Sequence, residues 1–139
     1  MFDLEGLTTV GGSLALKNMP PAKKDAYTVS LAKKAGLIQL GKTSTVELAL
    51  GGLGTNSNFT TPENVIMRDI ARAPGGSSSG SGVALASNLC SASFGTDTGG
   101  SVRIPAAWNR LIGLKTSIGR IPLNGVLELA STYDTVGPL

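Results

Sequence analysis

The chain has 139 residues, of which 41% are hydrophobic and 15% charged, and its formal net charge is +3. This length supports one domain with a hydrophobic core, and the composition is typical of a folded chain rather than a disordered one. The sequence has no histidine and a single cysteine, Cys90. These counts exclude Ser-His-Asp and Cys-His catalysis, disulfides and the usual zinc sites within these residues. We therefore expect no metal and no cofactor.

The basic residues are scattered, and their only local concentration is the set Lys23, Lys24, Lys33 and Lys34. Direct nucleic-acid binding requires a denser basic stripe with interleaved aromatic residues, so we predict none. No apolar run approaches the roughly 20 residues that a membrane span needs. The first five residues lack a signal-peptide pattern. We therefore expect no membrane association and a cytoplasmic location.

The first half of the chain predicts one clear helix and several short elements. Residues 22–35 carry a weak helical apolar face and end at Gly36, a residue type that commonly terminates helices. Residues 37–40 (LIQL) predict a short buried strand, and residues 46–50 predict a second helix. Residues 51–63 are rich in turn-forming types and predict a loop.

The second half alternates glycine-rich turns with short apolar elements. Strands that alternate with helices are typical of an α/β domain built on a sheet. The predicted elements, in chain order, are a loop over 75–82, a helix over 83–88, a strand over 91–94, a loop over 95–100, a helix over 101–110 and a strand over 111–114.

Two short motifs resemble known sites but lack their context. Residues 36–43 match the phosphate-binding pattern G-x-x-x-x-G-K-[ST], yet the four middle residues are mostly apolar and predict a strand rather than a phosphate-binding loop. Residues 76–80 match G-x-S-x-G with Ser78 at the centre. That nucleophile elbow needs a histidine base, which the sequence lacks. Neither motif is adopted as the functional site.

Three further motifs occur in order along the chain: PGGSSSGS at 74–81, GTDTGGSVRIPAA at 95–107 and GLKT at 113–116. Together they resemble the amidase-signature family, and shorter matches on both sides extend the resemblance over essentially all 139 residues. The resemblance implies an α/β amidase-signature fold, in which helices flank a mixed central sheet. It also implies hydrolysis of a small-molecule amide to a carboxylate and ammonia or an amine, without a cofactor.

The resemblance assigns roles to two serines. The serine that follows GTD and two glycines is the family's nucleophile, and Ser101 matches it. Ser77 matches the bridging serine, which passes a proton between the nucleophile and a lysine base. A hydroxyl can do this because it both donates and accepts hydrogen bonds. The nucleophile would form an acyl-enzyme that water cleaves. The resemblance also implies a cis peptide bond between Gly76 and Ser77.

The loop that precedes Ser101 is expected to stabilise the reacting carbonyl group. By resemblance, its backbone N–H groups form an oxyanion hole, in which a single donor is worth about 10²–10³ in rate. The residues concerned are Thr98, Gly99 and Gly100. We interpret Asp97 and Arg103 as partners that hold this loop, and Lys115 as the end of a packed strand.

The lysine base does not occur where the resemblance predicts it. Phe2 and Asp3 match the end of the family's K-D-x-F-D stretch, which places the lysine upstream of them. Lys17 and Lys42 fall elsewhere in the pattern and are interpreted as structural. We therefore expect residues 1–139 to form a single partial domain that lacks the N-terminal catalytic-lysine segment and the C-terminal remainder.

Two alternatives stay open at this point. The glutaminase subunit of a tRNA-dependent amidotransferase shares these motifs, but it often reads GGSIRQPA, and Ile104 stands here in place of the glutamine. This difference favours a stand-alone amidase. The missing lysine favours an inactive remnant. The resemblance further leaves room for a homodimer in the full-length family member.

Overall fold

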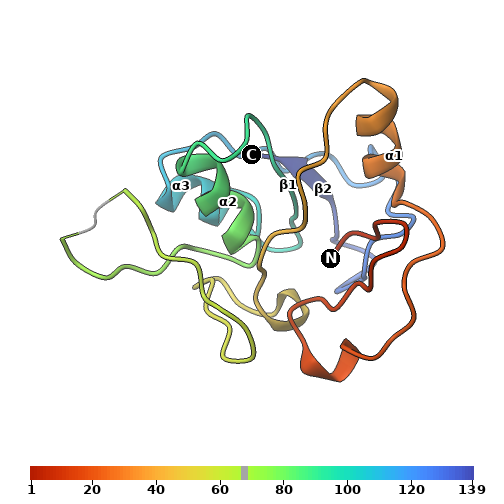
Figure 1. Ribbon diagram of the computed structural model, residues 1–139. Coiled ribbons are helices and arrows are strands. Elements are labelled where there is room, and N and C mark those ends of the chain that lie inside the picture. The colour runs from red at the N-terminus through yellow and green to blue at the C-terminus, as the bar shows by residue number, and fades with distance from the viewer. Residues whose placement is uncertain (67–68) are drawn as a thin grey trace.

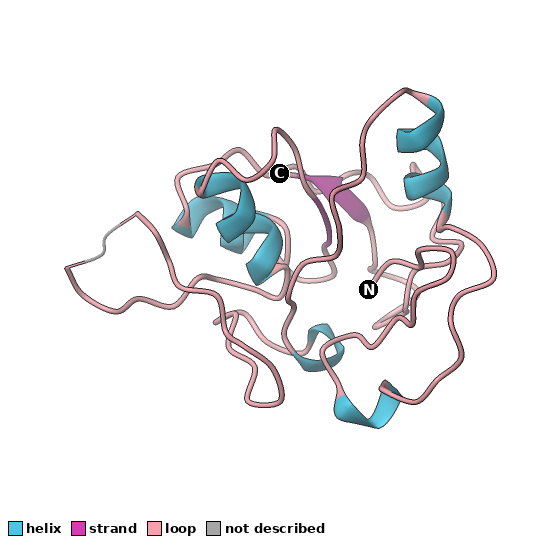
Figure 2. Cartoon of the chain, viewed as in Figure 1, coloured by secondary structure: helices cyan, strands magenta, loops and turns pink. Residues whose placement is uncertain are grey.

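Loops and turns connect a few short elements in the computed structural model, which describes residues 1–66 and 69–139 (Figure 2). Much of the chain follows an irregular path because glycine, proline and small polar residues interrupt its apolar segments. The elements are η1 (Leu14–Leu16), α1 (Tyr27–Lys34), η2 (Glu47–Ala49), α2 (Ser79–Ala86), β1 (Phe94–Thr96), α3 (Arg103–Trp108) and β2 (Val136–Pro138).

The sheet in the described residues is a two-stranded antiparallel pair. Strand β1 pairs with β2, so that Gly95 lies opposite Gly137 and Thr96 opposite Val136. Helices α2 and α3 pack against each other on one side of this pair, while α1 lies on the other side (Figure 1). The segment that carries the predicted nucleophile therefore runs from the end of β1 into the start of α3.

Two apolar clusters form the core. The first joins Val102, Ala106 and Leu139, with Leu85 and Leu111 packed against them. It lies where α2, α3 and the end of β2 meet, so it supports both serine motifs. The second cluster sits beneath α1, and its members are Leu4, Ala26 and Val29 with Phe2 and Val126.

Helix α2 begins at Ser79, four residues before the predicted start at residue 83. The predicted loop over 75–82 was therefore wrong in its second half. Small residues allow this early start, because a Cβ at Gly80 would collide with the backbone of Ser44. A Cβ at Gly82 would likewise press on Pro105, at 3.0 Å from its Cβ. The Gly/Ser composition thus reflects close packing of a helix.

The predicted strand over 37–40 is wrong. Residues 37–40 form an extended exposed segment, in which Ile38 is 87% exposed and Leu40 is 74% exposed. Within the described ranges, no neighbouring strand lies beside this segment. A strand requires a partner for its backbone hydrogen bonds, and sequence alone does not supply one.

The other predicted boundaries differ by smaller amounts. The first helix begins at Tyr27 rather than 22, because the backbone of Ala22 and Ala26 is hydrogen-bonded to the N-terminal segment. The predicted helix over 46–50 is a single 3₁₀ turn, η2, and the strand over 91–94 falls at Phe94–Thr96. The predicted strand over 111–114 is irregular, although the Leu114 N–H donates to the Pro138 carbonyl at 3.1 Å.

Candidate active site

The two serine motifs lie side by side in the structure. The N–H of Ser78 donates to the carbonyl of Ser101 at 3.2 Å, which joins the loop before α2 to the loop before α3. The carbonyl of Ser77 accepts from the N–H of Val46 at 3.1 Å and from the hydroxyl of Thr45 at 2.9 Å. These bonds fix the backbone at Ser77 from both sides. Two motifs that lie apart in the sequence are thus in direct contact through their backbones.

Ser77 is fully buried, and its hydroxyl oxygen has no hydrogen-bond partner among the described residues. A buried hydroxyl without a partner costs free energy, and such groups are rare in folded proteins. Ser101 is half-buried. The peptide bond between Gly76 and Ser77 is cis, as the resemblance implies.

Glycines let the loop before Ser77 approach its neighbours closely. The N–H of Gly76 donates to the carbonyl of Gly52 at 2.8 Å, and a Cβ at Gly76 would lie 2.7 Å from the nitrogen of Gly54. Asn109 holds the start of the loop, because its side-chain amide donates to the Pro74 carbonyl at 2.7 Å. No larger residue than glycine fits at position 76 without moving backbone.

Asp97 organises the second loop. Its buried carboxylate accepts from the N–H groups of Gly100 at 2.7 Å and Val102 at 3.2 Å, and from the Arg103 side chain at 3.0 Å. Burial opposes ionisation of this carboxyl. The hydrogen bonds from Arg103, Val102 and Gly100 outweigh burial and lower the pKa of Asp97 to about 2. The prediction that Asp97 and Arg103 hold this loop is confirmed.

The loop leaves several backbone donors free. In the described part of the chain, the N–H groups of Thr98, Gly99 and Ser101 donate to no protein acceptor. The N–H of Gly100, by contrast, is engaged by the Asp97 carboxylate. Gly99 is exposed, and a Cβ there would meet nothing within 4 Å. These free donors could hold a developing negative charge on a carbonyl oxygen that reacts with Ser101.

Two residues that the sequence did not assign to the site hold the same loop from outside. The Lys115 ammonium donates to the carbonyls of Asp97 and Thr98, the second at 3.2 Å. The Asp134 carboxylate accepts from the Thr98 hydroxyl. The segment around Lys115 does lie beside β2, since the Leu114 N–H donates to the Pro138 carbonyl, but the contacts of its ammonium with the loop were not predicted. A signal was available for Lys115, because it belongs to the matched GLKT motif.

The neighbouring serines contribute loop contacts rather than helix caps. The Ser78 hydroxyl donates to the Thr96 carbonyl at 3.4 Å, and the Ser81 hydroxyl donates to the Phe94 carbonyl at 2.8 Å. Ser78 precedes α2 but makes no side-chain capping bond. Both serines therefore tie the first serine loop and α2 to strand β1.

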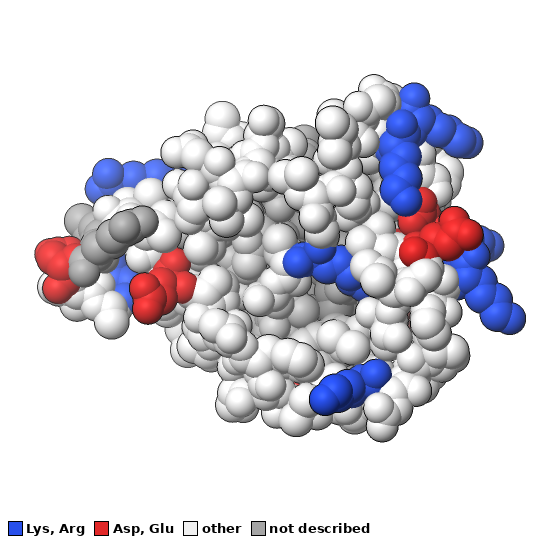
Figure 3. Space-filling view, in the orientation of Figure 1, with Lys and Arg blue, Asp and Glu red and all other residues white. Residues whose placement is uncertain are grey.

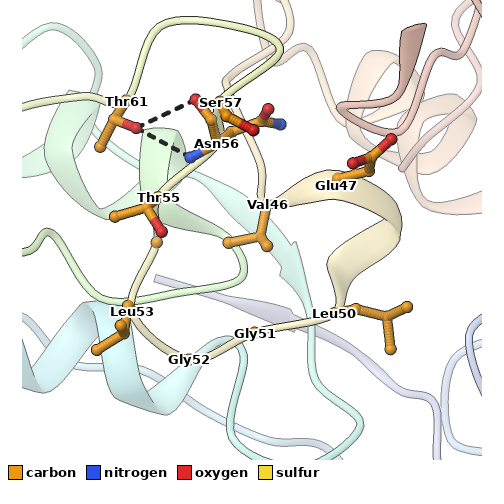
Figure 4. Close-up of a pocket in the computed structure, with 11 residues that line it drawn as sticks. Val46, Glu47, Leu50, Gly51, Gly52, Leu53, Thr55, Asn56, Ser57 and Thr61 are labelled. Atoms are coloured by element: carbon orange, nitrogen blue, oxygen red, sulfur yellow. Dashed lines mark hydrogen bonds between the residues drawn. The ribbon is translucent and has the colours of Figure 1, made fainter.

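A cavity of about 530 Å³ adjoins the first loop, and Figure 4 shows the residues that line it. Its wall includes η2 and residues 50–57, and Glu47 is the charged residue of the lining. The carbonyls of Gly52 and Leu53 in this wall accept from the N–H groups of Gly76 and Gly75. The wall of the cavity is therefore hydrogen-bonded to the loop that precedes Ser77. Neither Ser77 nor Ser101 lines the cavity.

A second, more apolar cavity of about 730 Å³ extends between α1, residues 36–45 and strand β1. Ser78 and Thr96 also line it. Figure 3 shows a hollow at the centre of one molecular face, with most charged side chains gathered at the two ends.

The Lys42 ammonium contacts Thr8 and Thr9, and among the described contacts it bonds to neither Ser77 nor Ser101. Its ammonium donates to the hydroxyl of Thr9 at 3.0 Å and to the carbonyl of Thr8 at 3.3 Å. Partial burial lowers the pKa of Lys42, while nearby Asp3 opposes that change. The structure thus gives Lys42 a bridging contact between two segments.

Two further features were sought within residues 1–66 and 69–139, a metal-binding cluster and a membrane-spanning helix. No group of three or more histidine, cysteine, aspartate or glutamate side chains there could hold a metal ion. None of the helices described is long and apolar enough to cross a membrane.

The site thus combines a buried serine hydroxyl, a hydrogen bond between the two serine motifs and free N–H groups on a glycine-rich loop. Comparison with known proteins identifies the family. The family model for amidases matches residues 1–139. The chain therefore belongs to the amidase family, and the predicted α/β amidase-signature fold is confirmed, although its described sheet has only two strands.

Individual relatives agree with this assignment. The chain is 42% identical to the A-type subunit of the glutamyl-tRNA(Gln) amidotransferase of Bdellovibrio bacteriovorus, and the match covers 100% of this chain and 28% of that protein. It is 41% identical to the 2-amino-5-chloromuconic acid deaminase of Comamonas testosteroni, over 100% of this chain and 30% of that one. The chain thus spans less than a third of the length of these relatives.

A solved structure of similar fold comes from a vestigial protein complex that bears on the origins of an s-triazine catabolic enzyme. It superposes with a TM-score of 0.94 at 37% identity, and the match covers 99% of this chain and 30% of that chain.

Proposed function

We propose that the protein hydrolyses a carboxamide through a seryl acyl-enzyme, with Ser101 as nucleophile and Ser77 as bridging serine. The observation that carries this proposal is the unpartnered, fully buried hydroxyl of Ser77 in a loop bonded directly to the backbone of Ser101. The free N–H groups of Thr98 and Gly99 support it, because they lie on the loop that leads to Ser101. Gly100 contributes through its bond to Asp97, which shapes this loop.

The chemistry would proceed in two steps. Ser101 Oγ attacks the amide carbon, its proton passes to Ser77 Oγ, and the Ser77 proton passes to a base. The carbonyl oxygen then carries the negative charge that the loop N–H groups stabilise. Collapse releases ammonia or an amine with a returned proton, and water cleaves the acyl-enzyme by the same route.

The family resemblance assigns the base to a lysine. In the described residues no side chain is hydrogen-bonded to Ser77 Oγ, so none of them is placed in that role. The substrate would be a small-molecule amide. We also propose a cytoplasmic setting, which suits a chain whose one cysteine, Cys90, is free.

Covalent labelling with a fluorophosphonate tests this proposal. We expect modification of the peptide that contains Ser101, complete loss of labelling in Ser101→Ala, and a decrease of several powers of ten in Ser77→Ala. Exposed Ser117 provides a matched control, and Ser117→Ala should label like the parent chain. Labelling at another serine, or no labelling of folded protein, would reject Ser101 as nucleophile and favour an inactive remnant.

A second candidate is the glutaminase activity of a tRNA-dependent amidotransferase, which the 42% identity to the Bdellovibrio protein favours. Ile104 in place of glutamine still argues for a stand-alone amidase. Ammonia release separates the two, because a stand-alone amidase should act on simple carboxamides without a partner. Release only from glutamine, and only with partner proteins, would support the second candidate.

A further inference from the structure

The Lys115 ammonium binds backbone carbonyls from two segments of the chain. Its ammonium donates to the carbonyls of Asp97, Thr98 and Tyr133, the last at 3.0 Å. It also lies 3.4 Å from the Thr135 hydroxyl and 3.5 Å from the Asp97 carboxylate. Its side chain is only 24% exposed. This cation therefore joins the Ser101 loop to the segment that leads into β2.

The two loop carbonyls differ in how much they depend on Lys115. The Asp97 carbonyl also accepts from the N–H of Thr135 at 3.1 Å and from its hydroxyl at 2.9 Å. For the Thr98 carbonyl, Lys115 is the one partner within the described residues. Loss of Lys115 would therefore leave the Asp97 carbonyl held and free the Thr98 carbonyl.

The Thr98 carbonyl controls the direction of a neighbouring N–H group. A trans peptide unit is planar, and its C=O and N–H point in opposite directions. The Thr98 carbonyl and the Gly99 N–H share one such unit. Because Lys115 binds the carbonyl, the Gly99 N–H points away from the Lys115 ammonium. Gly99 has no side chain and open space around it, so no packing contact at Gly99 restrains this peptide.

We propose that Lys115 is a positioning residue, which aims the Gly99 N–H at the carbonyl oxygen of the substrate. This proposal rests on the proposed function, since it assumes that the loop before Ser101 holds that oxygen. Lys115 touches neither serine in the described contacts and acts through the peptide unit alone. Its effect should therefore fall on bond formation rather than on binding of the ground state.

The test combines labelling kinetics with NMR of the whole chain. In Lys115→Met, we expect the rate constant for bond formation with the fluorophosphonate to fall on the order of a hundredfold, as for the loss of one oxyanion donor. The constant for reversible binding should change by less than about twofold. The ¹H–¹⁵N resonance of Gly99 should move. Lys115→Arg, which keeps donors and charge, should recover labelling to within about tenfold of the parent chain.

Lys42→Met is a matched control, because Lys42 also binds a carbonyl and a threonine hydroxyl but lies away from the loop. It should leave both readouts unchanged. Normal labelling and an unmoved Gly99 resonance in folded Lys115→Met would overturn the proposal. If Lys115→Met does not fold, Lys115→Gln takes its place under the same criteria. If the parent chain shows no labelling at Ser101, the proposed function fails. In that case the NMR measurement alone tests Lys115, and an unmoved Gly99 resonance in Lys115→Met would reject its positioning role.

Discussion

The serine core, defined as residues 74–82 and 94–106, contrasts with the extended segment of residues 36–44. In the serine core, polar groups such as Ser77 and Asp97 are fully buried. In the extended segment, apolar side chains face outward, with Ile38 87% exposed. In these two regions, burial of a side chain therefore does not follow its hydrophobicity alone. Close approach of glycines and hydrogen bonds to main-chain groups organise the serine core.

The largest expected difference between the two regions concerns their glycines. Gly76→Ala should lower the free energy of unfolding by about 3 kcal/mol, because the new Cβ would collide with backbone atoms of Gly54 that cannot move aside. Gly41→Ala in the extended segment meets nothing within 4 Å and should be close to neutral. Urea denaturation followed by circular dichroism measures both. Equal midpoints would remove the packing argument for the serine core.

A smaller contrast is expected for branched apolar side chains. Val102 is fully buried between α2, α3 and β2, so Val102→Ala should cost about 2 kcal/mol through lost contacts and a cavity. Ile38→Ala should change the free energy of unfolding by less than about 0.5 kcal/mol, since that side chain is exposed. Thermal unfolding of the two variants provides the measurement. A large loss for Ile38→Ala would show that the extended segment is covered in solution.

The pH dependence of stability sharpens the comparison further. The pKa of Asp97 is lowered from 3.8 to about 2, so its ionised form stabilises the folded state. This contribution is complete above about pH 4 and is lost as the pH falls through 2, and it amounts to about 2 kcal/mol. Asp97→Asn should abolish this part of the acid sensitivity. Glu128→Gln, at an exposed position, is the control and should leave the acid profile unchanged.

Some structural features followed from sequence because they depend on local chemistry. The glycines next to Ser77 predicted a tight loop, and the pairing of Asp97 with Arg103 six residues later was interpreted correctly. The strand over 37–40 failed because an apolar run records side-chain character but does not identify a neighbour. The start of α2 was missed because Ser79 to Gly82 resemble a linker until their packing partners are known.

The sequence by itself determined the family, and it predicted the two serines and the loop that carries the candidate oxyanion donors. Only the tertiary structure decided which of those donors are free. It placed Lys115 and Asp134, which follow Thr98 by 17 and 36 residues, on the same loop. In the tertiary structure the Gly100 N–H donates to the Asp97 carboxylate, whereas the Gly99 N–H donates to no acceptor in the described residues. The physical reason is that motifs specify residue types along the chain, whereas the direction of a peptide N–H depends on what binds the carbonyl of the same peptide unit.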